Sequence, residues 1–261
     1  MEFFADYSVS VMVFLFFSAF CAGFIDSVAG GGGLIQVPSL LISLPESPIA
    51  TLFGTNKIAS LAGTSVAAYR YSKEIKFNYK LLFLMSLSAG IASFVGARIV
   101  SLIHVTVLKP IIFVLLIGIA IYTFLNNNLG LAKTKSLTHN KQLFYGLLVG
   151  SGFGFYDGFF GPGAGSFLVL GFVVIFGFEF IEASAYSKFI NCMTNIAALL
   201  VFIPQGNFII HLAIIMALGN IFGNFFGARL ALQKGNKFVR LFFLIVVTGL
   251  IIRFGYDIFI K

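Results

Sequence analysis

The chain has 261 residues, of which 59% are hydrophobic and only 10% are charged. A soluble domain carries about 25% charged residues, so a surface this poor in charge is expected to be solvated by lipid. The formal charge of +8 does not indicate nucleic-acid binding, because lysine and arginine lie mainly in short connections between apolar runs, where they set membrane orientation. We therefore expect one transmembrane domain, residues 1–261, that crosses the bacterial inner membrane several times and contacts lipid but no nucleic acid.

Ten apolar runs follow one another along the chain. The first five are 8–28, 34–44, 49–69, 79–100 and 107–125. After a polar linker at about 126–141, the second five are 143–160, 166–178, 181–203, 208–232 and 238–259. Runs of this kind predict an all-α polytopic membrane protein, in which a helix needs about 20 apolar residues to cross the hydrocarbon core.

Two of the runs, 34–44 and 166–178, are too short to cross as ordinary helices. Each directly follows a glycine cluster, so both are expected to be half-helices after a break in the membrane, whether they span or re-enter. Such breaks are tolerated only where the backbone is buried in protein or faces a water-filled cavity.

The two sets of five runs are copies of one unit. Three ionisable residues of the first half recur with a shift of 131 residues: Asp26, Lys57 and Arg98 return as Asp157, Lys188 and Arg229. The sequence predicts repeat 1 at about 8–125 and repeat 2 at about 142–259.

The number of runs and the basic residues predict that the repeats are inverted. Five runs in each half is an odd number, so the second half should enter the membrane from the opposite face. The link after the third run is basic, with Arg70, Lys73, Lys76 and Lys80, whereas its counterpart at 204–207 carries no charge. Equivalent links that exchange their basic character are typical of inverted repeats. Both termini are then expected on the periplasmic side.

Ionisable side chains inside the runs indicate a site, because each costs about 2.5–3.5 kcal/mol at mid-membrane. On a helix, Lys57, Ser60 and Thr64 share one face. Lys188, Asn191 and Asn195 repeat the pattern, and two such stripes suit a shared anion site. The alternative is a buried ion pair between Asp26 and Lys57, repeated between Asp157 and Lys188, and the two interpretations are compatible.

The glycine clusters predict the rest of the site. Unwinding at Gly30–Gly33 and at Gly161–Gly165 would let the next half-helix present free backbone N–H groups, and a helix N-terminus binds anions. The candidate substrate-binding residues lie on the polar stripes or at the half-helix starts: Lys57, Lys188, Asn56, Thr55, Ser60, Ser187, Asn191, Asn195, Gly31, Gly32, Gly33, Gly163, Gly165 and Ser166.

Other charged residues receive secondary roles. Asp26 and Asp157 are candidates for coupling or ion pairing, and Arg98 and Arg229 for a vestibule on each side, unless these arginines simply reach the interface. Neither metal-ligand spacing nor a catalytic motif is found, so we expect no metal, no cofactor and no enzyme activity.

The glycine-rich unit resembles a known family. Gly23-Phe24-Ile25-Asp26, the glycines after it, Gly54-Thr55-Asn56-Lys57 and the later Gly-Ala-Arg resemble the TauE/SafE family, also called TSUP permeases. The resemblance covers nearly the whole chain, although Pro162 and Ser187 depart from the first-half pattern. It implies transport of small sulfur-containing anions such as sulfite, sulfonates or sulfoacetate without ATP. We therefore predict a secondary transporter that works by alternating access, with an anion channel as the alternative; the sequence is compatible with a homo-oligomer.

Overall fold

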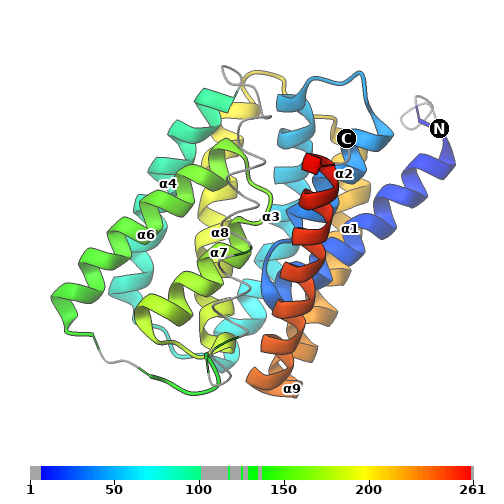
Figure 1. Cartoon of the computed structure of the whole chain (residues 1–261). Helices are drawn as coiled ribbons and strands as arrows, with labels where there is room; N and C mark the ends of the chain where they lie inside the picture. The colour runs from blue at the N-terminus through cyan, green and yellow to red at the C-terminus, as the bar shows by residue number, and fades with distance from the viewer. Residues whose placement is uncertain (1–6, 101–116, 118–124, 126–128, 135–136, 260–261) are drawn as a thin grey trace.

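The computed structural model describes residues 7–100, 117, 125, 129–134 and 137–259, and within these residues it is helical with no β-strand (Figure 1). Among the described residues, four stretches are long and apolar enough to cross a membrane: α1 (Val9–Ala29), α4 (Tyr79–Ile99), α8 (Phe180–Phe202) and Ile210–Gly249 within α9. The prediction of an all-α polytopic membrane protein is confirmed. The predicted run 107–125 lies outside the described residues, apart from positions 117 and 125.

The two short runs form short helices after breaks. In the first half, α1 ends at Ala29, with Gly30 as its C-cap, and α2 covers Gly33–Ser43. In the second half, α6 (His139–Phe159) is followed by α7 (Ala164–Gly171), which continues as the π-helical segment η4 (Phe172–Phe176). Both breaks therefore fall at the glycine clusters.

Two helices differ in length from the predicted runs. Helix α3 covers Ile49–Glu74, five residues beyond the predicted end, because its last turn is polar and extends out of the apolar stretch. Helix α9 is assigned to Ile210–Phe259, but Gly235 inside it has φ 80° and ψ −177°. The chain turns back at this glycine (Figure 1), so the two arms correspond to the predicted runs 208–232 and 238–259.

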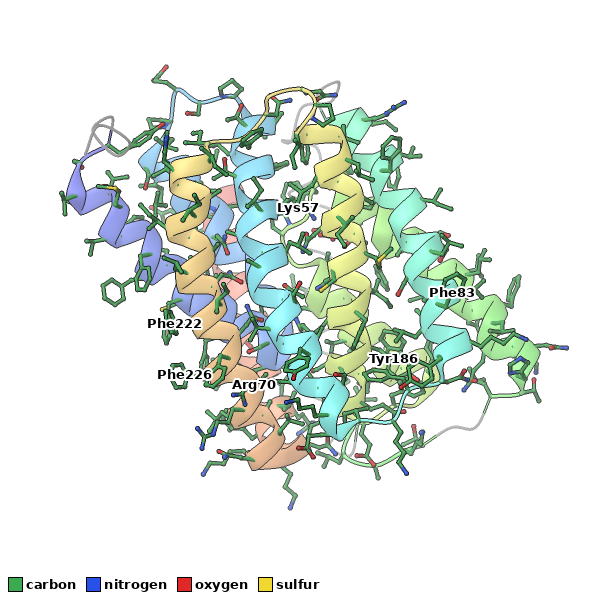
Figure 2. All side chains as sticks on the ribbon, turned by 180° about the vertical axis from the view of Figure 1, so that it is seen from behind. Lys57, Arg70, Phe83, Tyr186, Phe222 and Phe226 are labelled. Carbon is green, nitrogen blue, oxygen red and sulfur yellow. The ribbon has the colours of Figure 1, made fainter. Side chains whose placement is uncertain are left out.

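Equivalent helices of the two halves make equivalent contacts. Helix α1 packs against α9 and its counterpart α6 packs against α4, while α3 and α8 lie side by side and run in opposite directions in both views (Figures 1 and 2). A Cβ atom on Gly96 would collide with the carbonyl oxygen of Phe155, and one on Gly227 with that of Phe24. The two contacts are equivalent, because Gly227 lies 131 positions after Gly96 and Phe24 lies 131 positions before Phe155.

Large apolar side chains point outward, as Phe83, Phe222 and Phe226 do in Figure 2, where they are 71%, 50% and 48% exposed. Polar side chains such as Lys188 and Asn224 are fully buried. Folding in water would place these classes the other way round. The outer surface is therefore suited to lipid, and the polar residues are gathered inside the bundle.

Candidate functional site

The two helix breaks cross each other at the centre of the bundle. Gly30 and Gly31 have φ values of 76° and 88°, in the left-handed region that favours glycine. A Cβ atom on Gly30 would collide with the main chain of Gly165 and Ser166, and one on Gly165 would lie 3.1 Å from the Cα atom of Gly30. The backbones of the two halves thus touch at positions where no side chain fits.

Two ion pairs, one buried and one partly buried, flank this crossing, and each joins one half of the chain to the other. The Nζ atom of Lys57 on α3 lies 2.9 Å from Oδ1 of Asp157 at the end of α6, with side chains 5% and 8% exposed. The Nζ atom of Lys188 on α8 lies 2.9 Å from Oδ2 of Asp26 at the end of α1. The alternative prediction, a pair within each half, named the correct residue types but the wrong partners.

Threonines complete the carboxylate surroundings. The hydroxyl group of Thr64 on α3 donates to Asp26 over 3.4 Å, and that of Thr194 on α8 donates to Asp157. Each carboxylate therefore accepts from a lysine of the other half and from a threonine of its own half. Buried charges need such partners to offset the loss of water.

A cavity of about 40 Å³, with room for a few water molecules, lies at this crossing. Its lining is polar and comes from both halves: Asp26, Gly31, Gly32, Gly33, Gln36, Asn56, Lys57, Ser60, Thr64, Asp157, Gly161, Gly163, Gly165, Asn191, Asn195 and Asn220.

The cavity wall carries hydrogen-bond donors that nothing else uses. The N–H groups of Gly31, Gly32 and Gly33, at the start of α2, make no hydrogen bond within the described part of the chain. The same holds for those of Gly163 and Gly165 at the start of α7. Free N–H groups at a helix start carry partial positive charge, so both half-helices favour a bound anion.

The two lysines differ in the donors they leave free. An ammonium group has three donors. Lys57 lies on the side of α3 next to α8 (Figure 2), lines the cavity and makes a single hydrogen bond among the described residues. Lys188 does not line the cavity, and its Nζ atom donates to the main-chain oxygen of Asp26 as well as pairing with its carboxylate. Lys57 is therefore the better placed of the two to contact a ligand.

Several predicted site residues lie away from the cavity and hold the fold together. The hydroxyl group of Thr55 donates to Thr51 and accepts from the N–H of Ile209, which ties α3 to the start of α9. The hydroxyl groups of Ser187 and Ser166 donate to main-chain oxygens of Gly165 and Ala29.

The predicted vestibule residues also lie outside the cavity lining. Arg98 and Arg229 are exposed on α4 and α9, and the guanidinium group of Arg98 lies 4.5 Å from the ring centre of Phe94. Their positions agree with side chains that reach toward an interface.

Sequence reasoning missed Gln36 and Asn220, which line the cavity, and Thr194, which donates to Asp157. These three side chains are uncharged and lie in apolar runs, so they do not stand out in the sequence as the ionisable residues do. A polar residue in the first turn of the half-helix at 34–44 was the signal available for Gln36.

Comparisons with known proteins identify one family and several relatives named as membrane transporters. The family model described as "Sulfite exporter TauE/SafE" matches residues 15–254. The chain is 39% identical over 249 residues to "Probable membrane transporter protein ORF9" of Sinorhizobium sp, with 95% of this chain and 94% of the relative covered. It is 37% identical over 250 residues to "Probable membrane transporter protein YfcA" of Escherichia coli K12, with 93% of this chain and 89% of the relative covered. A "Probable membrane transporter protein" of Haemophilus influenzae is 31% identical over 252 residues, with 97% of each chain covered. No solved structure matches.

Proposed function

Since this chain belongs to the sulfite exporter TauE/SafE family, we propose that it is a secondary transporter that moves a small sulfur-containing anion across the bacterial inner membrane. The names of its relatives indicate a membrane transporter rather than an enzyme. The substrate class is sulfite or a small organosulfonate, and transport proceeds by alternating access without ATP.

The observation that carries this proposal is the set of unused donors at the crossing. Five backbone N–H groups at the starts of α2 and α7 and the free donors of Lys57 belong to one cavity. A sulfonate or sulfite group offers three oxygens that share negative charge, and hydrogen bonds that involve a charged group are roughly twice as strong as neutral ones. The two ion pairs balance two positive against two negative side chains, so the helix starts supply the remaining attraction for an anion.

The arrangement of the ion pairs supports a moving carrier. Each pair joins a helix break of one half to the long helix α3 or α8 of the other half, beside the cavity. In transporters with inverted repeats, one repeat rocks against the other around a central site. Contacts of this kind are suited to hold the halves together and to be remade as the cavity opens to the other side.

Reconstitution of the purified protein in liposomes tests the proposal. We expect saturable uptake of labelled sulfite or a small sulfonate that is accelerated when unlabelled substrate is loaded inside the vesicles. Carboxylates of matched size should compete poorly. Uptake that does not saturate and shows no acceleration by internal substrate would instead identify an anion channel.

A further inference from the structure

We propose that Gln36 is a specificity-determining residue that donates a hydrogen bond to an uncharged acceptor on the substrate, so that the preferred sulfonate carries a hydroxyl or carbonyl group beside its charged head. This inference rests on the function proposed above. It adds the polar tail of the substrate and the side chain that recognises it.

A chain of amide hydrogen bonds fixes which end of the Gln36 side chain is the donor. The Nδ2 group of Asn224 donates to the main-chain oxygen and to Oδ1 of Asn220, over 3.0 and 2.8 Å. The Nδ2 group of Asn220 donates to the main-chain oxygen of Ala19 over 3.4 Å and to Oε1 of Gln36 over 2.7 Å. A main-chain oxygen only accepts, so both asparagine orientations are determined, and Gln36 must present Nε2 as its remaining polar atom.

The backbone makes room for this chain of amides. A Cβ atom on Gly63 of α3 would collide with Oδ1 of Asn220, and one on Gly23 of α1 would lie 2.5 Å from the Asn220 main-chain oxygen. Helices α1 and α3 thus each place a glycine against Asn220. The amide chain is a packed part of the interior and not a surface arrangement.

The last amide of this hydrogen-bonded series, that of Gln36, has an unsatisfied donor. Gln36 is 1% exposed and lines the cavity, yet its Nε2 atom has no hydrogen-bond partner among the described residues. A buried donor without an acceptor costs about 1–3 kcal/mol, and an acceptor atom that arrives beside it removes this cost. Because Nε2 is covered in this conformation, the bond forms when the cavity wall adjusts around the substrate, as in induced fit.

The other half of the duplicated chain has no such feature. The residues 131 positions from Gln36 and Asn220 are Phe167 and Ala89, and the Phe167 ring packs on Phe153 and Tyr156 with ring centres 6.1 and 5.3 Å apart. The cavity is therefore polar toward Gln36 and closed by aromatic packing at the equivalent place. A substrate with a charged head and one polar tail matches this asymmetry.

Binding of two sulfonates of similar size by the purified protein tests the inference. Hydroxyethanesulfonate carries a hydroxyl group where propanesulfonate carries a methyl group. We expect the parent protein to bind the hydroxylated compound about tenfold more tightly, since an unpaired donor penalises the other. Gln36→Met should remove this preference, so that the variant binds the two compounds with equal affinity. Gln205→Met, in an exposed link, is the matched control.

Each result has a distinct consequence. If both sulfonates bind the parent equally and Gln36→Met changes neither, the donor is satisfied by water and the inference is overturned while the proposed function stands. Binding of neither compound would overturn the sulfonate assignment and the inference with it. Should Gln36→Met fail to fold, Gln36→Asn keeps an amide but withdraws the donor by one methylene, and retention of the full preference in that variant would contradict the proposal.

Discussion

The Nζ atom of Lys57 lies 2.9 Å from Oδ1 of Asp157, a residue 100 positions later in the chain and in the other half of the duplicated sequence. The equivalent contact joins Lys188 to Asp26. Every lysine of the site is thus neutralised by the half to which it does not belong. Removal of one lysine charge therefore leaves a carboxylate of the other half without its cation.

Removal of the Lys57 charge should affect both stability and binding. Lys57→Gln leaves the Asp157 carboxylate buried without its cation, and breaking a buried pair in this way costs about 3–5 kcal/mol. The matched double variant Lys57→Gln, Asp157→Asn should recover most of the melting temperature. Its affinity for the anion should remain at least about tenfold weaker, because the charge that contacts the substrate is absent.

The control for this cycle is the mismatched double variant Lys57→Gln, Asp26→Asn, which leaves Asp157 and Lys188 each without the carboxylate or lysine partner seen in the structure. It should be less stable than the matched variant. If the matched double variant instead binds substrate like the parent, Lys57 has a structural role and the anion is held by the helix starts.

Asp26 is the better candidate for coupling transport to pH. Its side chain is 15% exposed against 8% for Asp157, and it faces Lys188 from α8 and Thr64 from α3. Loss of the charge on this carboxylate removes a negative charge from the cavity, so an anion should bind more tightly when residue 26 is neutral. Asp26→Asn imitates the protonated form, and Lys188 retains the main-chain oxygen of residue 26 as an acceptor. We expect a flattened pH profile of flux in liposomes; unchanged profiles in Asp26→Asn and Asp157→Asn would rule out both carboxylates.

Labelling of introduced cysteines tests the inverted orientation. The link between α3 and α4 and the turn at Gly235 lie at one end of the bundle, and the link between α8 and α9 lies at the other (Figure 1). Basic residues gather at the first end, including Arg70, Lys73 and Lys237, so the positive-inside rule places that end in the cytoplasm.

Cysteines at Ser72 and Lys237 should therefore react with an impermeant reagent only from the cytoplasmic side, and one at Gln205 only from outside. Lys237 is preferable to its neighbour Asn236, whose side chain accepts from the N–H of Ile181 and donates to Glu179. Reaction at Ser72 and Gln205 from the same side would contradict the inverted arrangement.

Gly30 should tolerate no side chain. Gly30→Ala places a Cβ atom into the main chain of Gly165 and Ser166 and strains a residue with φ 76°. We expect little correctly folded protein, measured as the monodisperse fraction after purification. Gly152→Ala is the matched control: this glycine lies within α6 with nothing within 4 Å of its Cβ position, and the change should stabilise the helix by about 0.5–1 kcal/mol. Normal yield of Gly30→Ala would mean that the two breaks do not cross as closely as described.

The sequence by itself determined the class of the protein, most helix boundaries and the duplicated pattern of charges. Apolar runs and glycine clusters act locally, so α1, α2 and α4 begin and end within one residue of the predicted runs. It also predicted that Lys57, Asp26 and Asp157 have polar partners, because a charge inside a membrane run requires one.

Only the tertiary structure decided which lysine pairs with which aspartate. Distance along the chain does not specify which helices pack together, and the crossing of the two breaks at Gly30 and Gly165 brings the carboxylate of each half to the lysine of the other. The two lysines also differ in their surroundings, which the sequence did not predict. Lys57 keeps free donors in the cavity, whereas Lys188 does not line it. The donor of Gln36 depended on structure for a further reason: an amide has a donor and an acceptor end, and only the main-chain oxygens of Ala19 and Asn220 determine which end is left over.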